Sequence, residues 1–127
     1  MIDCLAIGDS IAVGLSGPMH CTPMAQVGRT SASQSLKIKV VNAKTVIISL
    51  GSNDRPNKVL AAYLRNVRKH IKAHQVVWII PYNAQRAAIV ETVARERGDR
   101  FVELSHFKTR DNIHPSSYDA VARKIMK

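Results

Sequence analysis

The sequence is poor in acidic residues and aromatic side chains, and it has no long apolar run. Nine Asp and Glu residues stand against 19 Lys and Arg residues in the 127-residue chain, which gives a formal net charge of +10. Aromatic side chains make up 5% of the residues, so we do not expect a platform on which nucleic-acid bases stack. The longest apolar runs, Thr45–Leu50 and Val76–Ile80, are far shorter than the ~20 residues of a membrane span.

Cysteine is also scarce, with two residues, Cys4 and Cys21, at the expected starts of two neighbouring strands. They could form a disulfide, or a metal site together with His20, or they could be buried thiols that pack as small hydrophobic groups. The segment Met1–Asp3 lacks the basic residues that open a signal peptide. We therefore expect a cytoplasmic chain, or one carried in a larger assembly, and two free buried thiols.

The length and the hydrophobic content predict a single globular domain that covers residues 1–127. At 127 residues, 46% of them hydrophobic, the chain can bury about two-thirds of its unfolded surface around one core. No repeat, linker or low-complexity segment divides it.

Short apolar runs alternate with amphipathic segments along the whole chain. The expected strands are 4–7, 23–27, 45–50, 76–80 and 100–104, and the expected helices are 10–15, 30–40, about 56–74, 83–97 and 116–126. Fully apolar strands that alternate with helices are typical of βαβ units, whose parallel sheet is covered on both faces. We therefore predict an α/β fold, a three-layer α/β/α sandwich with about five parallel strands.

Three polar segments follow expected strands. Ser10 follows the first strand in Gly8-Asp9-Ser10, Asn53 follows the third in Gly51-Ser52-Asn53-Asp54, and His114 lies after the fifth in Asp111-Asn112-Ile113-His114-Pro115. Because ligands of such sheets bind at the carboxyl ends of the strands, we expect these groups to meet at one edge. A hydroxyl, an imidazole with a nearby carboxylate and an amide donor are the groups that acyl transfer needs.

In this order the segments resemble the blocks of the SGNH (GDSL) hydrolase family. Gly8-Asp9-Ser10 is similar to the first block, Gly28 to the second, Gly51-Ser52-Asn53-Asp54 to the third and Asp111-x-x-His114-Pro115 to the last. Ser31–Ser33 stand where the family often has a further glycine. The resemblance implies a flavodoxin-like sandwich, an acyl-hydrolase activity and no metal or other cofactor.

The resemblance also implies a role for each matched residue. Ser10 would be the nucleophile, His114 the general base, and Asp111 the carboxylate that orients the imidazole. The oxyanion would be bound by the Asn53 side chain and by the backbone N–H groups of Gly28 and Ser10.

Simpler structural roles are open for the same residues. Ser10 could cap a helix, Asp111 could be a turn residue, and His114 could be a surface histidine beside a helix start. Asp9 is expected to orient the Ser10 turn, and Asp54 to cap the helix that contains Pro56. The α/β-hydrolase fold is disfavoured, because its nucleophile elbow needs a glycine two residues after the serine, where this chain has Ala12.

Basic residues gather in the segment 58–72. Helical spacing would place Arg65, Arg68, Lys69 and Lys72 on one face. Such a face could be solvated, or it could attract nucleic acid, an anionic lipid surface or an acidic polymer. Arg29 and Arg55 are next to the expected oxyanion residues, so either could contact a negatively charged substrate.

These patterns favour a serine esterase that cleaves a small acyl ester, such as acetyl on a glycan, through an acyl-enzyme on Ser10. The short chain leaves little room for a lid or an acyl tunnel. The alternative is an inactive protein with the same fold, which uses its basic surface to bind nucleic acid or another anionic partner.

Overall fold

The computed structural model describes all 127 residues, Met1–Lys127, and contains one five-stranded sheet in the order β2-β1-β3-β4-β5. All four strand pairs are parallel. In chain order the elements are β1 (Ile2–Gly8), α1 (Ser10–Met19), β2 (Thr22–Ala25), α2 (Ser31–Lys37), β3 (Val41–Ser49), α3 (Lys58–Lys69), β4 (Ile71–Ile80), α4 (Ala84–Glu96), β5 (Arg100–Glu103), a 3-10 turn at Leu104–His106, and α5 (Tyr118–Met126).

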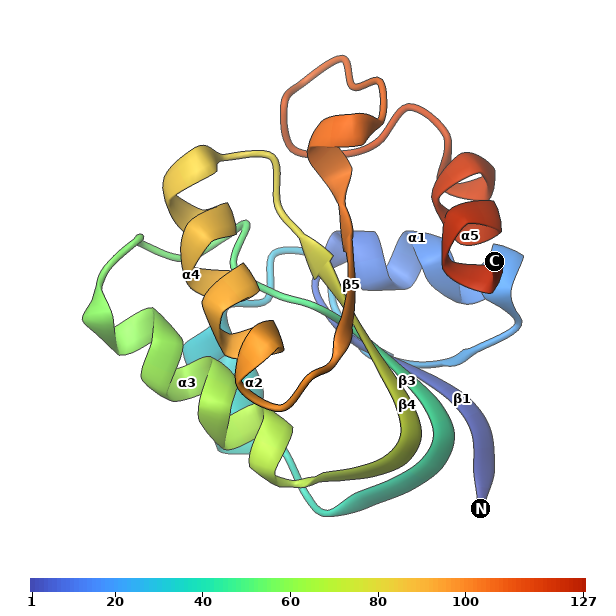
Figure 1. Ribbon diagram of the computed structural model, residues 1–127, viewed down its shortest axis with the longest axis vertical. Helices are drawn as coiled ribbons and strands as arrows, with labels where there is room; N and C mark the ends of the chain where they lie inside the picture. The colour runs from blue at the N-terminus through green and yellow to red at the C-terminus, as the bar shows by residue number, and fades with distance from the viewer.

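The helices cover both faces of the sheet, which confirms the predicted three-layer α/β/α fold. Helices α2, α3 and α4 lie on one side, and α1 and α5 pack together on the other (Figure 1). Each face has its own apolar core. Alternate residues of β1 enter different cores. Leu5 and Ile7 join the core beneath α3 and α4, and Ala6 joins the core beneath α1 and α5. None of these helices has the length and apolarity that crossing a bilayer requires.

The two central strands begin earlier than predicted. β3 starts at Val41 and β4 at Ile71, and the added segments pair in parallel, with Val41 opposite Ile71 and Ala43 opposite Ala73. In both segments apolar residues alternate with exposed polar ones, such as Asn42 and Lys72, because only one face of each is covered there. This period of two indicates a half-buried strand, whereas the prediction looked for uninterrupted apolar runs.

The extension of β4 corrects the predicted helix and its basic face. α3 begins at Lys58, after an Asn57 cap whose side chain accepts a hydrogen bond from the N–H of Val59, and it ends at Lys69. Lys72 therefore belongs to a strand and cannot share a helical face with Arg65 and Arg68.

The two cysteines form a disulfide, so the expectation of free thiols was wrong. The pairing of β1 with β2 places Leu5 opposite Thr22, and it therefore brings Cys4 and Cys21 next to each other. Their Cα atoms are 4.6 Å apart, within the range that a disulfide can bridge. The bridge closes a loop that contains all of α1 and the Gly8-Asp9-Ser10 turn.

Removing this bridge should destabilise the fold. A cross-link across 17 residues restricts the unfolded chain, which is typically worth about 3 kcal/mol. We expect the double variant Cys4→Ser, Cys21→Ser to lose roughly that free energy of unfolding, measured by urea denaturation without reductant. Reduced wild type should match the variant, and identical midpoints for the oxidised and reduced wild-type protein would contradict the expectation.

Candidate active site

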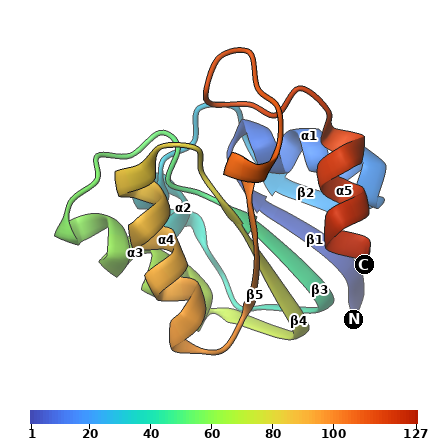
Figure 2. The same cartoon turned by 45° about the horizontal axis from the view of Figure 1, so that its top comes forward.

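The carboxyl edge of the sheet collects the residues that the sequence singled out. Ser10 follows β1, Gly28 follows β2, and Asn53 follows β3. His114 lies in the long connection from β5 to α5, which passes over the same end of the molecule as the other loops (Figure 2). The fold thus brings a serine near one end of the chain and a histidine near the other into hydrogen-bonding distance.

The Ser10 turn is held against the end of β3. Gly8 has φ +135°, and a Cβ atom there would lie 1.8 Å from the carbonyl oxygen of Ser49, so only glycine fits. The N–H of Asp9 donates to the same carbonyl. The Asp9 side chain caps α1 by accepting from the N–H of Ile11, and it also accepts from the Ser49 hydroxyl. Asp9 therefore orients the Ser10 turn, as expected.

Ser10, His114 and Asp111 form a continuous hydrogen-bonded series. The Ser10 Oγ lies 2.8 Å from His114 Nε2, and His114 Nδ1 lies 2.7 Å from Asp111 Oδ2. The hydrogen bond from His114 and those from backbone N–H groups hold the pKa of Asp111 well below its usual range. An ionised Asp111 only accepts hydrogen bonds, so the Nδ1 atom carries the proton and Nε2 is free to accept from the serine hydroxyl.

A tight loop sets the position of the imidazole. Asp111 Oδ1 accepts from the backbone N–H groups of Ile113 and His114, so the carboxylate folds back over its own loop. The Thr109 hydroxyl donates to the carbonyl of His114 at 2.6 Å and accepts from the N–H of Asn112, whose φ is +62°. The sequence analysis did not identify Thr109, because a threonine in a loop carries no distinctive pattern.

The groups that the sequence suggested as oxyanion donors follow β1, β2 and β3. The N–H of Ser10 is at the first position of α1, where a helix offers it no partner. The N–H of Gly28 makes no hydrogen bond within the chain, and a Cβ atom at Gly28 would point into open space. The Asn53 side chain is exposed, and its Nδ2 atom donates to the carbonyl of Arg29 at 3.2 Å.

Asp54 does not cap the following helix, contrary to expectation. Its carboxylate accepts from both the N–H and the hydroxyl of Ser31, at 2.9 Å and 2.7 Å, at the start of α2. This contact fastens the segment that contains Gly28 and Arg29 to the loop that contains Asn53. Ser31 is one of the serines that stand where the SGNH family often has a glycine, and the pairing explains what a hydroxyl does there.

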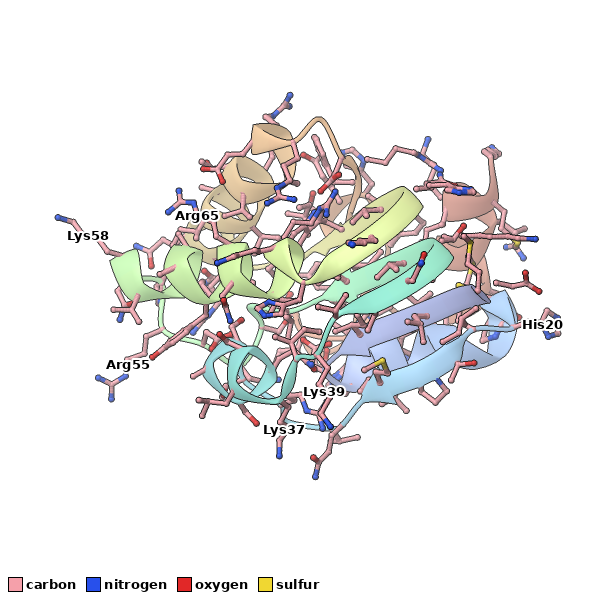
Figure 3. The ribbon with its side chains drawn as sticks, turned by 90° about the horizontal axis from the view of Figure 1, so that it is seen from below. His20, Lys37, Lys39, Arg55, Lys58 and Arg65 are labelled. Atoms are coloured by element: carbon pink, nitrogen blue, oxygen red, sulfur yellow. A yellow bond between two sulfur atoms is a disulfide. The ribbon has the colours of Figure 1, made fainter.

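The two arginines that the sequence suggested as substrate contacts have different surroundings. The guanidinium of Arg29 donates to the carbonyl of Met24 and to the side chains of Gln34 and Gln26. Arg55 is exposed and extends away from the ribbon (Figure 3). The chain also contains no group of three or more His, Cys, Asp or Glu side chains that could hold a metal ion.

Comparison with known proteins supports the fold. No protein-family model matches the chain, and no curated protein matches it. Among solved structures, the native aryl esterase of M. Smegmatis has the same architecture, with a TM-score of 0.67, 12% identity and coverage of 99% of each chain. This likeness shows a shared fold over the full length of the chain, and that fold is the one the resemblance to SGNH hydrolases implied.

Asp9 is the one fully buried carboxylate at the site. Its Oδ1 atom receives the hydrogen bonds from Ile11 and Ser49, whereas Oδ2 is buried without a partner. Burial raises the pKa of Asp9 to about 6, although the hydrogen bonds from Ser49 and Ile11 act in the opposite direction. The folded protein therefore binds the proton of Asp9 more tightly than the unfolded chain does.

This proton linkage predicts a pH-dependent stability. Below the unfolded pKa, near 4, Asp9 is neutral in both states. As the pH rises from there through about 6, Asp9 ionises first in the unfolded chain, so the folded protein loses stability. Asp9→Asn keeps the Oδ1 acceptor but cannot ionise. We expect the variant to gain about 3 kcal/mol relative to wild type between pH 4 and pH 8, measured by urea denaturation. The exposed control Asp119→Asn should show little change, and a pH-independent difference for Asp9→Asn would contradict the expectation.

Proposed function

We propose that this protein is a serine esterase that cleaves small acyl esters through a covalent acyl-enzyme on Ser10. The observation that supports it most directly is the continuous contact of Ser10 with His114 and of His114 with Asp111. Free donors of the oxyanion kind lie at the same edge, and the full-length structural likeness is to an aryl esterase. We accordingly place Ser10, His114 and Asp111 in the catalytic machinery.

Acylation begins when Ser10 Oγ attacks the acyl carbon and its proton passes to His114 Nε2. The ionised Asp111 stabilises the imidazolium that forms. The negative charge moves to the former carbonyl oxygen, where the N–H groups of Ser10 and Gly28 and the Asn53 amide donate to it. The tetrahedral intermediate then collapses, the bond to the alcohol oxygen breaks, and His114 returns the proton to the leaving alcohol.

Deacylation repeats these steps with water as the nucleophile. His114 removes a proton from the water as its oxygen attacks the acyl carbon, and the same donors stabilise the second oxyanion. Ser10 leaves as the hydroxyl after it takes the proton back from His114, and the carboxylic acid is released. The balance is one ester and one water giving one acid and one alcohol.

The surroundings of Ser10 favour a short acyl group. The hollows beside the site are lined mostly by polar residues. A long acyl chain would find little apolar surface to cover it, so little binding free energy would come from extra methylene groups. Acetyl esters, including acetyl groups on a glycan, therefore fit the proposal best.

A second candidate function is the binding of an anionic polymer. Two adjoining hollows at the opposite edge of the sheet share Arg68 and Arg97, and Lys69 and Arg100 also line them. The nearest acids are already paired, Asp99 with Arg68 and Glu96 with Arg65.

Further exposed cations are Lys37 at the end of α2, Lys39 in the connection to β3, and Lys58 at the start of α3 (Figure 3). With a net charge of +10, this surface would attract polyanions in a salt-dependent way.

Substitution of the nucleophile and the base distinguishes the two candidates. We expect Ser10→Ala and His114→Ala to abolish hydrolysis of p-nitrophenyl acetate, and Asp111→Asn to retain more activity because Asn preserves part of the loop geometry. Loss of the nucleophile alone typically costs several powers of ten in kcat. The measurement is the initial rate, with folding checked by circular dichroism.

Ser105→Ala is the matched control, because Ser105 is exposed and makes no hydrogen bond through its hydroxyl. Equal rates for wild type and Ser10→Ala would refute the esterase proposal. Salt-dependent retention of both proteins on immobilised duplex DNA, without turnover by either, would instead favour the second candidate.

The Asn53 amide can be tested separately. Loss of one oxyanion donor usually lowers kcat by about 10²- to 10³-fold, because the donor binds charge that develops only in the transition state. We expect Asn53→Ala to lower kcat on p-nitrophenyl acetate far more than it raises KM. The exposed Asn42→Ala serves as the control. A variant with wild-type kcat would show that Asn53 has no part in binding the oxyanion, even if Ser10 proves essential.

A further inference from the structure

A polar groove adjoins the candidate active site at the carboxyl edge of the sheet. It is lined by the loops after β3, β4 and β5 and by Arg86 in the first turn of α4. It meets the site at two points. Asp111, which is hydrogen-bonded to His114, forms part of one wall, and Ser52, the neighbour of Asn53, forms part of another. A molecule held here would lie next to the imidazole that protonates the leaving alcohol.

The groove carries hydrogen-bonding groups that the fold does not use. The hydroxyl of Ser52 and the side-chain amide of Asn112 make no hydrogen bond within the chain. Asn83 uses its Oδ1 atom to cap α4, where it accepts from the N–H of Arg86, but its Nδ2 atom is unengaged. The hydroxyl of Tyr82, by contrast, donates to the carbonyl of Phe107. These free groups suit a partner rich in hydroxyl groups.

Arg86 adds a positive charge to this wall. Its side chain is half-buried, and Nε donates to the carbonyl of Asp54, which fixes the direction of the guanidinium. Both terminal nitrogens lack a hydrogen-bond partner, and no carboxylate pairs with Arg86. A guanidinium with its two terminal nitrogens free can bind a carboxylate or phosphate in a bidentate manner.

Asp111 is the other charged residue of the groove, and its charge is already satisfied. It accepts from the imidazole of His114 and from the backbone N–H groups of Ile113 and His114. Its pairing with the imidazole is also needed for the chemistry. The groove therefore has one cation without a counter-ion, and the net charge of +10 adds a long-range attraction for anions.

We infer that the groove binds the alcohol portion of the ester, and that Arg86 selects an alcohol that bears an anionic group, such as an O-acetylated uronic acid. This inference rests on the proposed esterase activity. The hydroxyl groups of the sugar meet Ser52, Asn83 and Asn112, and the carboxylate meets Arg86. Neither Arg29 nor Arg55, the cations that the sequence suggested, lines this groove.

The test compares two acetyl esters that differ only in charge, O-acetyl methyl galacturonoside and O-acetyl methyl galactoside. The readout is the ratio of their kcat/KM values within each protein, which cancels any general effect of a substitution on turnover. Wild type should favour the anionic ester by about tenfold or more, the range of one charge-assisted hydrogen-bonded pair. Arg86→Gln should bring the ratio near one, and Arg86→Lys should restore part of it.

Two further variants sharpen the result. Asn83→Asp keeps the oxygen that caps α4 but places a negative charge beside Arg86, so its ratio should fall below that of wild type. Arg123→Gln removes a distant exposed cation, and its ratio should stay at the wild-type value. A wild-type ratio of one, or an unchanged ratio in Arg86→Gln, would overturn the inference.

Binding without turnover separates this inference from the proposed function. Methyl galacturonoside should shift NMR signals of Ser52, Asn83 and Asn112 in the inactive Ser10→Ala protein, and Arg86→Gln in that background should weaken the binding. If p-nitrophenyl acetate is not hydrolysed, the esterase proposal fails. If turnover occurs but methyl galacturonoside binds no better than methyl galactoside, the inference about the groove fails alone.

Discussion

The contact between the ends of β1 and β3 is the constraint on which the candidate site depends. Gly8 lies so close to Ser49 that no side chain fits, and the N–H of Asp9 donates to the Ser49 carbonyl. This fixes where α1 starts, and therefore where the Ser10 hydroxyl lies relative to the loop after β3. The second constraint is the short loop that turns Asp111 back onto His114. Two rigid pieces, built from opposite ends of the chain, meet at one hydrogen bond.

Acidic and basic side chains differ in how far they are engaged within the protein. This difference connects the proposed esterase activity with the inference about the groove. Most acids are engaged, for example Asp54 with Ser31, Asp99 with Arg68 and Trp78, and Asp111 with His114. Cations therefore remain in excess on the surface and in the groove beside the site. A protein of this kind would bring anionic substrates to its surface before any specific contact forms, and the groove would then choose among them.

Much of the fold could be predicted from sequence because uninterrupted apolar runs such as Thr45–Leu50 indicate buried parallel strands. The first residues of β3 and β4 were not predicted as strand. In Ile71–Gln75 buried and exposed residues alternate because only one face of the sheet is covered there, so no uninterrupted apolar run marks the strand. The local spacing of Asp111 and His114 allowed the return of the carboxylate to be predicted. The disulfide, the contact of Asp54 with Ser31 and the position of Arg86 depend on strand register and on loops meeting in space, which a single sequence does not reveal.

Arg86 is connected through Asp54 to the segment that contains Gly28 and Arg29. Its guanidinium holds the main-chain oxygen of Asp54, and the carboxylate of Asp54 holds Ser31, just beyond Gly28 and Arg29. Under the proposed function, a ligand that immobilises Arg86 would also restrain the backbone around Gly28, whose N–H would bind the oxyanion. Substrate recognition and rate enhancement would then be coupled. Under this arrangement, good and poor substrates would differ in the speed of acyl transfer as well as in the tightness of the initial complex.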